Sequence, residues 1–143
     1  IEDARQEEFH ADEIVKSNAA RAPLRSEIVN AKAEMARLDT KIDAGTLEMA
    51  RLDTEIETRS TEIAVLATEI KRIDQLYSIS GVPAEIYDEY KRDLNLHNAL
   101  VAESNALGNS YNALVAESKE LMISYNALVE KINRIVEELN WAP

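Results

Sequence analysis

The sequence EMARLDT occupies residues 34–40 and returns unchanged at residues 48–54. In the second half of the chain, NALV begins at Asn98 and returns at Asn112 and Asn126, again at intervals of fourteen residues. Fourteen residues are two heptads, and an apolar pattern on a multiple of seven is typical of coiled coils. The interval is shorter than the units of solenoid repeats, which run to about 20–50 residues. The two repeats therefore predict a coiled coil.

Both halves of the chain hold a heptad without a skip. In the first arm, position a holds Ile28, Met35, Ile42, Met49, Ile56, Ile63, Ile70 and Tyr77, and position d holds Leu24, Ala31, Leu38, Gly45, Leu52, Arg59, Leu66 and Ile73. In the second arm, position a holds Tyr90, His97, Ser104, Tyr111, Ser118, Tyr125, Ile132 and Leu139, and position d holds Ile86, Asp93, Leu100, Leu107, Leu114, Leu121, Leu128 and Ile135. Spacing of three and four residues over this length predicts two long helices that share a narrow seam.

A short stretch from Ser78 to Glu85 separates the two arms. Gly81 favours the end of a helix, Pro83 suits the first position of a new one, and Glu85 then meets the positive end of its dipole. A short loop between long helices makes them antiparallel neighbours. The sequence therefore predicts an all-α fold. It is a long antiparallel helical hairpin, a two-stranded coiled coil with arms at about 24–77 and 84–140 and a turn at 78–83.

The position of the turn also predicts which residues face each other. A slip of one heptad is the competing register, but it either buries Gly81 and Pro83 inside a helix or leaves the bend without turn residues. We therefore expect these facing pairs: Ile70 with Asp93, Leu66 with His97, Arg59 with Ser104, Leu52 with Tyr111, and Leu38 with Tyr125.

Residues 1–22 form an acidic, helix-prone lead-in that does not continue the heptad. Phe9, Ile14 and Val15 are its only bulky contacts. Pro23 is expected to start or kink the first arm. The lead-in either enters from a further domain or folds back on the hairpin. Since the chain begins at Ile1 without a signal peptide, we expect a processed product or part of a longer protein.

Composition excludes several classes of function. The chain has 16 basic and 27 acidic residues, and its net charge of −11 argues against a nucleic-acid partner because no surplus of cations can neutralise phosphates. No run of 18 apolar residues exists, so no membrane insertion of this segment is expected. Without cysteine, the chain offers no disulfide, thiolate metal site or cysteine nucleophile.

Two polar sets at seam positions are the candidates for chemistry. Asp93 and His97 have the spacing of two metal ligands on one helix face, but the residues expected opposite them carry no further ligand atoms. We interpret them as a polar layer in which carboxylate and imidazole pair with each other. Arg59 is expected to pack its alkyl stem in the seam and to reach the carboxylates of Glu55, Glu62 and Glu103.

The chain also lacks a nucleophile elbow and a glycine-rich phosphate loop. The sequence therefore predicts no catalytic residue, no metal site, no cofactor and no small-molecule substrate. We do not expect an enzyme.

The outer surface of the second arm carries little charge. Between Leu94 and Ser118 only Glu103 and Glu117 are charged. Because position e is apolar as well, this arm has a d/e/a face of about three positions in seven, wider than one partner helix covers. The predicted partner-binding residues are Leu94, Val101, Val115, Met122, Val129 and Val136. Their expected partner is a second copy, giving a homodimer that forms a four-helix bundle, or a helix of another protein; otherwise these side chains are simply exposed.

Two stretches resemble known proteins. Tyr111-Asn112-Ala113-Leu114-Val115 and its echo at 125–129 resemble repeats in bacterial secreted or envelope coiled-coil proteins. The turn resembles the hairpin tip of periplasmic adaptor (membrane-fusion) proteins, which carries an Arg, a Leu four residues later and a Ser seven after that. Arg72 and Leu76 match this pattern, and Pro83 replaces the Ser. These resemblances imply a bacterial periplasmic or extracellular location.

The function expected from the sequence is that of a non-enzymatic coiled-coil module: a spacer, a scaffold or an oligomerisation element. The alternative, implied by the adaptor resemblance, is a hairpin that docks a channel or another partner through its tip. The tip residues in that case are Arg72, Leu76, Gly81 and Pro83.

Overall fold

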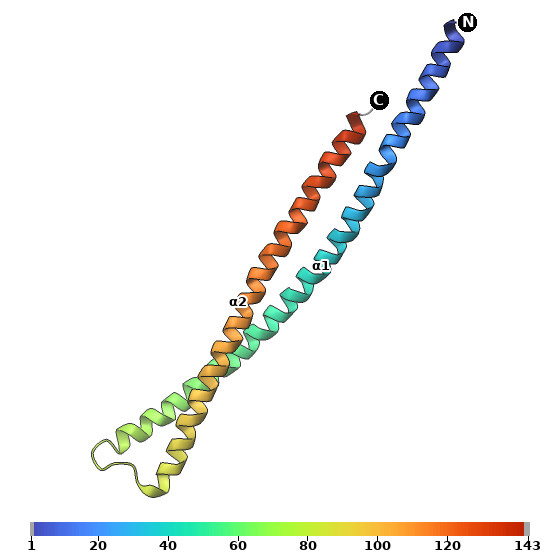
Figure 1. The fold of residues 1–143 in the computed structure, drawn as a ribbon. Helices are drawn as coiled ribbons and strands as arrows, with labels where there is room; N and C mark the ends of the chain where they lie inside the picture. The colour runs from blue at the N-terminus through green and yellow to red at the C-terminus, as the bar shows by residue number, and fades with distance from the viewer. Residues whose placement is uncertain (1, 142–143) are drawn as a thin grey trace. The chain divides into compact units, whose positions relative to one another are not determined.

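The computed structural model describes the backbone of residues 2–141 and the side chains of residues 19–140. Helix α1 spans Glu2–Leu76, helix α2 spans Ala84–Trp141, and a short turn joins them (Figure 1). No strand occurs among the residues so described. The fold is an all-α helical hairpin, which confirms the fold class predicted from the sequence.

Helix α1 begins at Glu2, so it contains the helix-prone lead-in as well as the first arm that was expected from about Leu24. Pro23 lies inside this helix and not at its beginning. Proline removes one backbone hydrogen bond and costs roughly 3 kcal/mol in a helix interior. This local cost is outweighed because the alanine-rich residues 19–22 and the long arm that follows both favour helix. The contacts expected of Phe9, Ile14 and Val15 lie outside the described side chains.

The turn runs from Tyr77 to Pro83, one residue longer than predicted. Gly81 adopts a φ of 76°, in the left-handed region that favours glycine, and its amide donates to the carbonyl oxygen of Tyr77 at 3.0 Å. The carbonyl oxygen of Pro83 accepts hydrogen bonds from the amides of Ile86 and Tyr87 at 3.0 and 2.8 Å. Gly81 and Pro83 therefore lie in the turn, as the sequence predicted, and α2 begins directly after Pro83.

The chain comprises two compact units, each containing segments of both helices. The turn unit is Gly45–Glu117, and the terminal unit is Ile1–Ala44 with Ser118–Pro143. Among the described side chains the turn unit buries Leu52, Ile73 and Leu100, and the terminal unit buries Ala31, Leu38 and Ile135. All six occupy predicted d positions, and the predicted a positions are half-buried in both helices. Burial therefore follows the predicted seam.

Contacts within each unit fix the pairing of the helices. In the turn unit, Arg59 Nη2 donates to Glu103 Oε1 at 3.1 Å, so Arg59 contacts the neighbour of its expected partner Ser104. In the terminal unit, Tyr125 lines the same depression as Asp39, the neighbour of its expected partner Leu38. A slip of one heptad would displace both contacts by seven residues. The Arg59–Glu103 hydrogen bond and the shared depression agree with the predicted register.

Candidate interaction surfaces of the hairpin

The outward surface of α1 is built from glutamate–arginine pairs. In each pair the guanidinium donates to both carboxylate oxygens of a glutamate three residues earlier. The pairs are Glu34–Arg37, Glu48–Arg51 and Glu69–Arg72. These hydrogen bonds lower the pKa of each glutamate and raise the pKa of each arginine. Because the pairs are exposed, they keep this face hydrophilic and contribute little to the free energy of unfolding.

The two EMARLDT copies form the same local structure. Each carries one glutamate–arginine pair and one threonine hydroxyl that donates to the carbonyl oxygen four residues earlier. These hydroxyl bonds measure 3.0 Å from Thr40 to Ala36 and 3.1 Å from Thr54 to Ala50. The copies differ at the next residue, since Glu55 accepts a second bond from Arg51 at 2.6 Å whereas Lys41 follows the first copy. The repeat thus places the same polar surface on both units.

Arg59 is a charged residue at a seam position of α1. Its side chain is 29% exposed, and it contacts Glu103 at 3.1 Å and Glu62 at 3.5 Å. Its Nε is buried and has no hydrogen-bond partner. Two of the three expected carboxylates are therefore contacted, while the third, Glu55, binds Arg51. Arg59 joins the two helices of the turn unit at a position that suits neither full burial nor full hydration.

Asp93 and His97 are both half-buried, but no hydrogen bond or ion pair joins them, so their expected pairing was wrong. The physical reason is access to water: Asp93 lines an open depression of the turn unit together with Glu69 and Glu89. Water can hydrate its carboxylate there in place of the imidazole. Among the residues with described side chains, no cluster of three metal-ligating groups is found.

The six predicted partner-binding residues of α2 are partly covered within the chain. Met122 is 51% exposed and Val136 is 40% exposed. The other four, Leu94, Val101, Val115 and Val129, are half-buried. Position e lies beside the seam, so the seam itself covers one side of each of these side chains. The stripe is narrower than the sequence suggested, and its outer edge remains open.

An uncharged row of asparagines runs beside this stripe. Asparagine recurs at the b position of α2, one turn from each e residue, and every member of the row is exposed. The row consists of Asn98, Asn105, Asn112, Asn126 and Asn133. The e and b positions of α2 together form a flank of valines, Gly108, Met122 and asparagines. Between Leu94 and Asn133 the one charged residue in this flank is Lys119.

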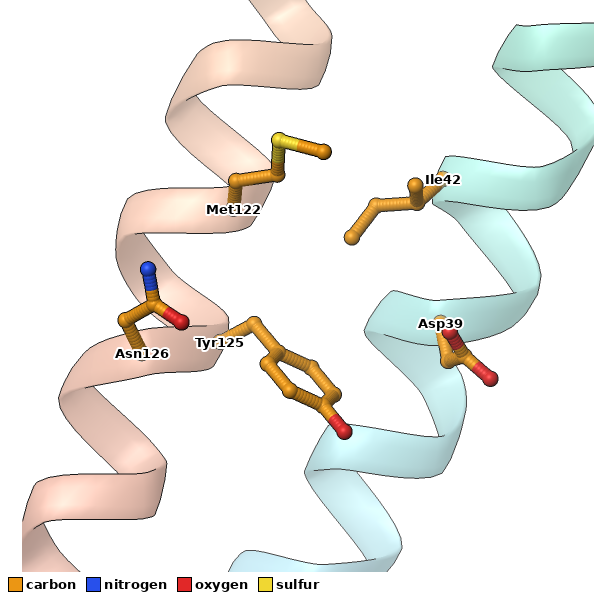
Figure 2. Close-up of a pocket in the computed structure, with 5 residues that line it drawn as sticks. All are labelled: Asp39, Ile42, Met122, Tyr125 and Asn126. Carbon is orange, nitrogen blue, oxygen red and sulfur yellow. The ribbon is translucent and has the colours of Figure 1, made fainter.

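Packing is loose around Met122. Asp39 and Ile42 of α1 and Met122, Tyr125 and Asn126 of α2 line an open depression of about 330 Å³. Figure 2 shows Met122 and Ile42 pointing toward each other across it, while the Tyr125 ring reaches toward α1. The depression combines apolar walls with a carboxylate, a phenol and an amide at its rim.

The predicted tip residues lie around the turn. Arg72 is held by Glu69, and Leu76, the last residue of α1, is exposed. Sequence analysis did not single out the most exposed residue of the turn, Ile79, which is 100% exposed. The helices also expose apolar residues that it passed over, Val29, Leu47, Val65, Tyr87, Leu96 and Ile123. All of these residues lie outside the predicted a and d positions. A search of the sequence for apolar residues outside those positions would have identified them.

None of the helical residues searched forms a stretch long and apolar enough to cross a membrane. Comparison with protein families, with curated proteins and with solved structures finds no match for this chain. Its function is therefore argued from its own residues.

Proposed function

We propose that this chain is a non-enzymatic interaction module, a coiled-coil hairpin that associates with a second copy through α2 and serves as a spacer, scaffold or oligomerisation element. The observation that carries the proposal is the contrast between the helices. Charged pairs recur along the outside of α1, whereas α2 leaves a flank of valines, Met122 and asparagines in which Lys119 is the one charged residue between Leu94 and Asn133.

The sparse core supports this proposal. Among the described side chains each unit buries three apolar ones, and the other seam residues are half-buried. Small folds with one narrow seam bury too little apolar area to be robust on their own. A second hairpin set against α2 would complete the burial of Val115, Val129 and their neighbours, and full burial of such a side chain contributes roughly 1.5–3 kcal/mol.

Electrostatics decides which helix is used. A net charge of −11 opposes association, but at physiological salt the repulsion is screened beyond about 8 Å. Only groups at the contact itself therefore matter. The flank of α2 from Leu94 to Val115 brings no charge into the contact, whereas α1 would bring its glutamates. We propose that the α2 helices meet at the centre of a four-helix bundle with the α1 helices outside.

The test introduces charge into one flank at a time. Val115→Lys with Val129→Lys should convert dimers to monomers, as measured by sedimentation, with helicity retained in circular dichroism. The matched control is Val29→Lys with Val65→Lys, two exposed valines of α1, which should leave the dimer intact. A dimer that survives in the α2 variant would overturn the proposal.

A second candidate is the adaptor-type function, in which the tip docks a channel or another partner in a bacterial periplasm or exterior. The specific observation in its favour is the full exposure of Ile79 between exposed Leu76 and Tyr87. Ile79→Asp should abolish binding of such a partner and leave self-association unchanged. Binding that is unaffected by Ile79→Asp would remove this candidate.

A further inference from the structure

We infer that two copies pair antiparallel along α2, symmetrically about Val115, with Met122 of each copy seated over Gly108 of the other. This inference rests on the proposed self-association and adds its orientation and register. It starts from a glycine that the isolated chain does not explain.

Gly108 lies in the interior of α2, where glycine is a poor helix former. A Cβ added at Gly108 would meet nothing within 4 Å, so no neighbour in this chain requires the missing side chain. Gly45 of α1 has similar space around it, but it lies at a seam position. Gly108 instead lies in the e series that carries the partner-binding residues, where a missing side chain leaves room for a group approaching from outside.

The e residues of α2 fit the same residues of a second copy that runs in the opposite direction. One antiparallel register pairs every e position from 94 to 136, and in it the smallest member faces the longest. The pairs are Leu94 with Val136, Val101 with Val129, Gly108 with Met122, and Val115 with Val115. A slide of one heptad leaves one end unpaired and sets Gly108 against a valine, and a slide of two heptads can set Gly108 against another glycine. Met122 suits the gap because methionine is unbranched and flexible, and it is half exposed beside an open depression.

The asparagine row agrees with the same register. Antiparallel pairing about Val115 brings Asn98 near Asn133 and Asn105 near Asn126, while Asn112 meets Lys119. Asparagine both donates and accepts hydrogen bonds, so an amide can bind its counterpart without burying a charge. Parallel pairing would instead set Lys119 against Lys119 and Gly108 against Gly108. The flank therefore favours the antiparallel arrangement.

The area is adequate for a stable contact. Residues seven apart on a helix are separated by about 10.5 Å, and a helix is about 10 Å wide, so each e layer covers on the order of 100 Å². Seven layers give on the order of 700 Å² per copy, close to the roughly 800 Å² per partner of a standard interface.

Single cysteines test the register, because the chain contains none of its own. A disulfide requires Cα atoms within about 7 Å, so only a residue on the two-fold axis can link to itself. Val115→Cys should form a covalent dimer under mild oxidation. Val101→Cys alone and Val129→Cys alone should not, whereas an equal mixture of these two should form the heterodimer.

The outcomes separate this inference from the proposed function. Self-linking of Val101→Cys would show parallel pairing, and self-linking of Gly108→Cys in place of Val115→Cys would show a slipped register; either overturns the inference while the dimer stands. If the unmodified chain is monomeric, both fail together. As an independent readout, Gly108→Leu should weaken the dimer about tenfold or more. Adding Met122→Ala should restore it, with helicity checked by circular dichroism. Gly108→Leu without effect would also overturn the inference.

Discussion

The two helices of the hairpin present different outer surfaces. Along α1, each glutamate–arginine pair holds charge in contact with water, and the pair recurs with the fourteen-residue repeat. Along α2, the repeat begins with asparagine and continues with alanine, leucine and valine, and only Glu103 and Glu117 are charged between Leu94 and Ser118. The same repeat length thus places charged pairs along α1 and largely uncharged residues along α2.

The two helices of this narrow hairpin therefore contribute different surfaces to the molecule. Helix α1 contributes to structure through its inner edge, where Leu38, Leu52 and Ile73 are buried. Helix α2 contributes an inner edge of the same kind and, beside it, a flank in which Lys119 is the one charged residue between Leu94 and Asn133. We therefore expect substitutions in α1 to change stability at the seam and to have little effect on its outer surface.

The largest effect is expected at the most buried residue of α1. Ile73 is 2% exposed, and Ile73→Ala should lower the free energy of unfolding by about 2–5 kcal/mol at fixed protein concentration, because it leaves a cavity in the seam. Ile123, on the outside of α2, is the matched control, and Ile123→Ala should change stability by about 0.5 kcal/mol or less. Urea unfolding followed by circular dichroism measures both. Equal losses would mean that burial does not follow the seam.

A smaller effect of opposite sign is expected at Arg59. Its ion pairs with Glu62 and Glu103 are partly exposed and are worth up to about 1 kcal/mol, while its buried Nε has no partner. Arg59→Leu should therefore raise the free energy of unfolding by up to about 1 kcal/mol, since an apolar residue suits the seam better. The outer-face control Arg37→Leu should leave the melting temperature unchanged. A clear loss of stability on Arg59→Leu would show that the ion pairs dominate.

Arg59→Leu should also loosen the register that Arg59 specifies. Cysteines at Leu52 and Tyr111 should link within one chain of the otherwise unmodified protein. With Arg59→Leu added, links from position 52 to positions 104 or 118 should appear as well. If the 52–111 link remains the sole product, Arg59 does not set the register.

The smallest effect concerns Tyr90 of α2, whose hydroxyl donates to Asp74 Oδ1 of α1 at 2.6 Å. This hydrogen bond, together with desolvation and the Asp74 charge, raises the pKa of Tyr90 above 10. A raised pKa in the folded state means that the bond stabilises the hairpin below about pH 10, and that this contribution is lost as pH rises through the higher folded value. Tyrosinate absorbance of the unmodified chain and of Tyr90→Phe isolates this group. Titration of Tyr90 at the ordinary tyrosine pKa would refute the expectation.

Periodicity and turn chemistry predicted the elements that depend on local pattern. The a and d positions follow from spacing alone, and Gly81 with Pro83 marks the reversal because few residue types suit a left-handed turn and a helix start. The first arm was placed from Leu24 because Pro23 was expected to start or kink it, although residues 1–22 are helix-prone; in the structure α1 runs through Pro23. The cost of one proline is local, whereas helix propensity accumulates over a long segment.

The surfaces were less predictable because they depend on side-chain placement in three dimensions. The partial cover of Val101 and Val115 depends on how far α2 is rotated toward α1, which residue spacing does not specify. Whether Asp93 pairs with His97 depends on the rotamers of both side chains, which their spacing in the sequence does not specify. The exposure of Ile79 follows from the path of the turn, which sequence analysis placed without describing its side chains.

Sedimentation of the unmodified chain tests the central claim most directly. At near-physiological salt and tens of micromolar protein, the account predicts a species of twice the 16.0 kDa chain mass that dissociates on dilution. A species of 16.0 kDa throughout that range would contradict it. The flank of α2 would then be covered by residues 1–22 or by a different partner.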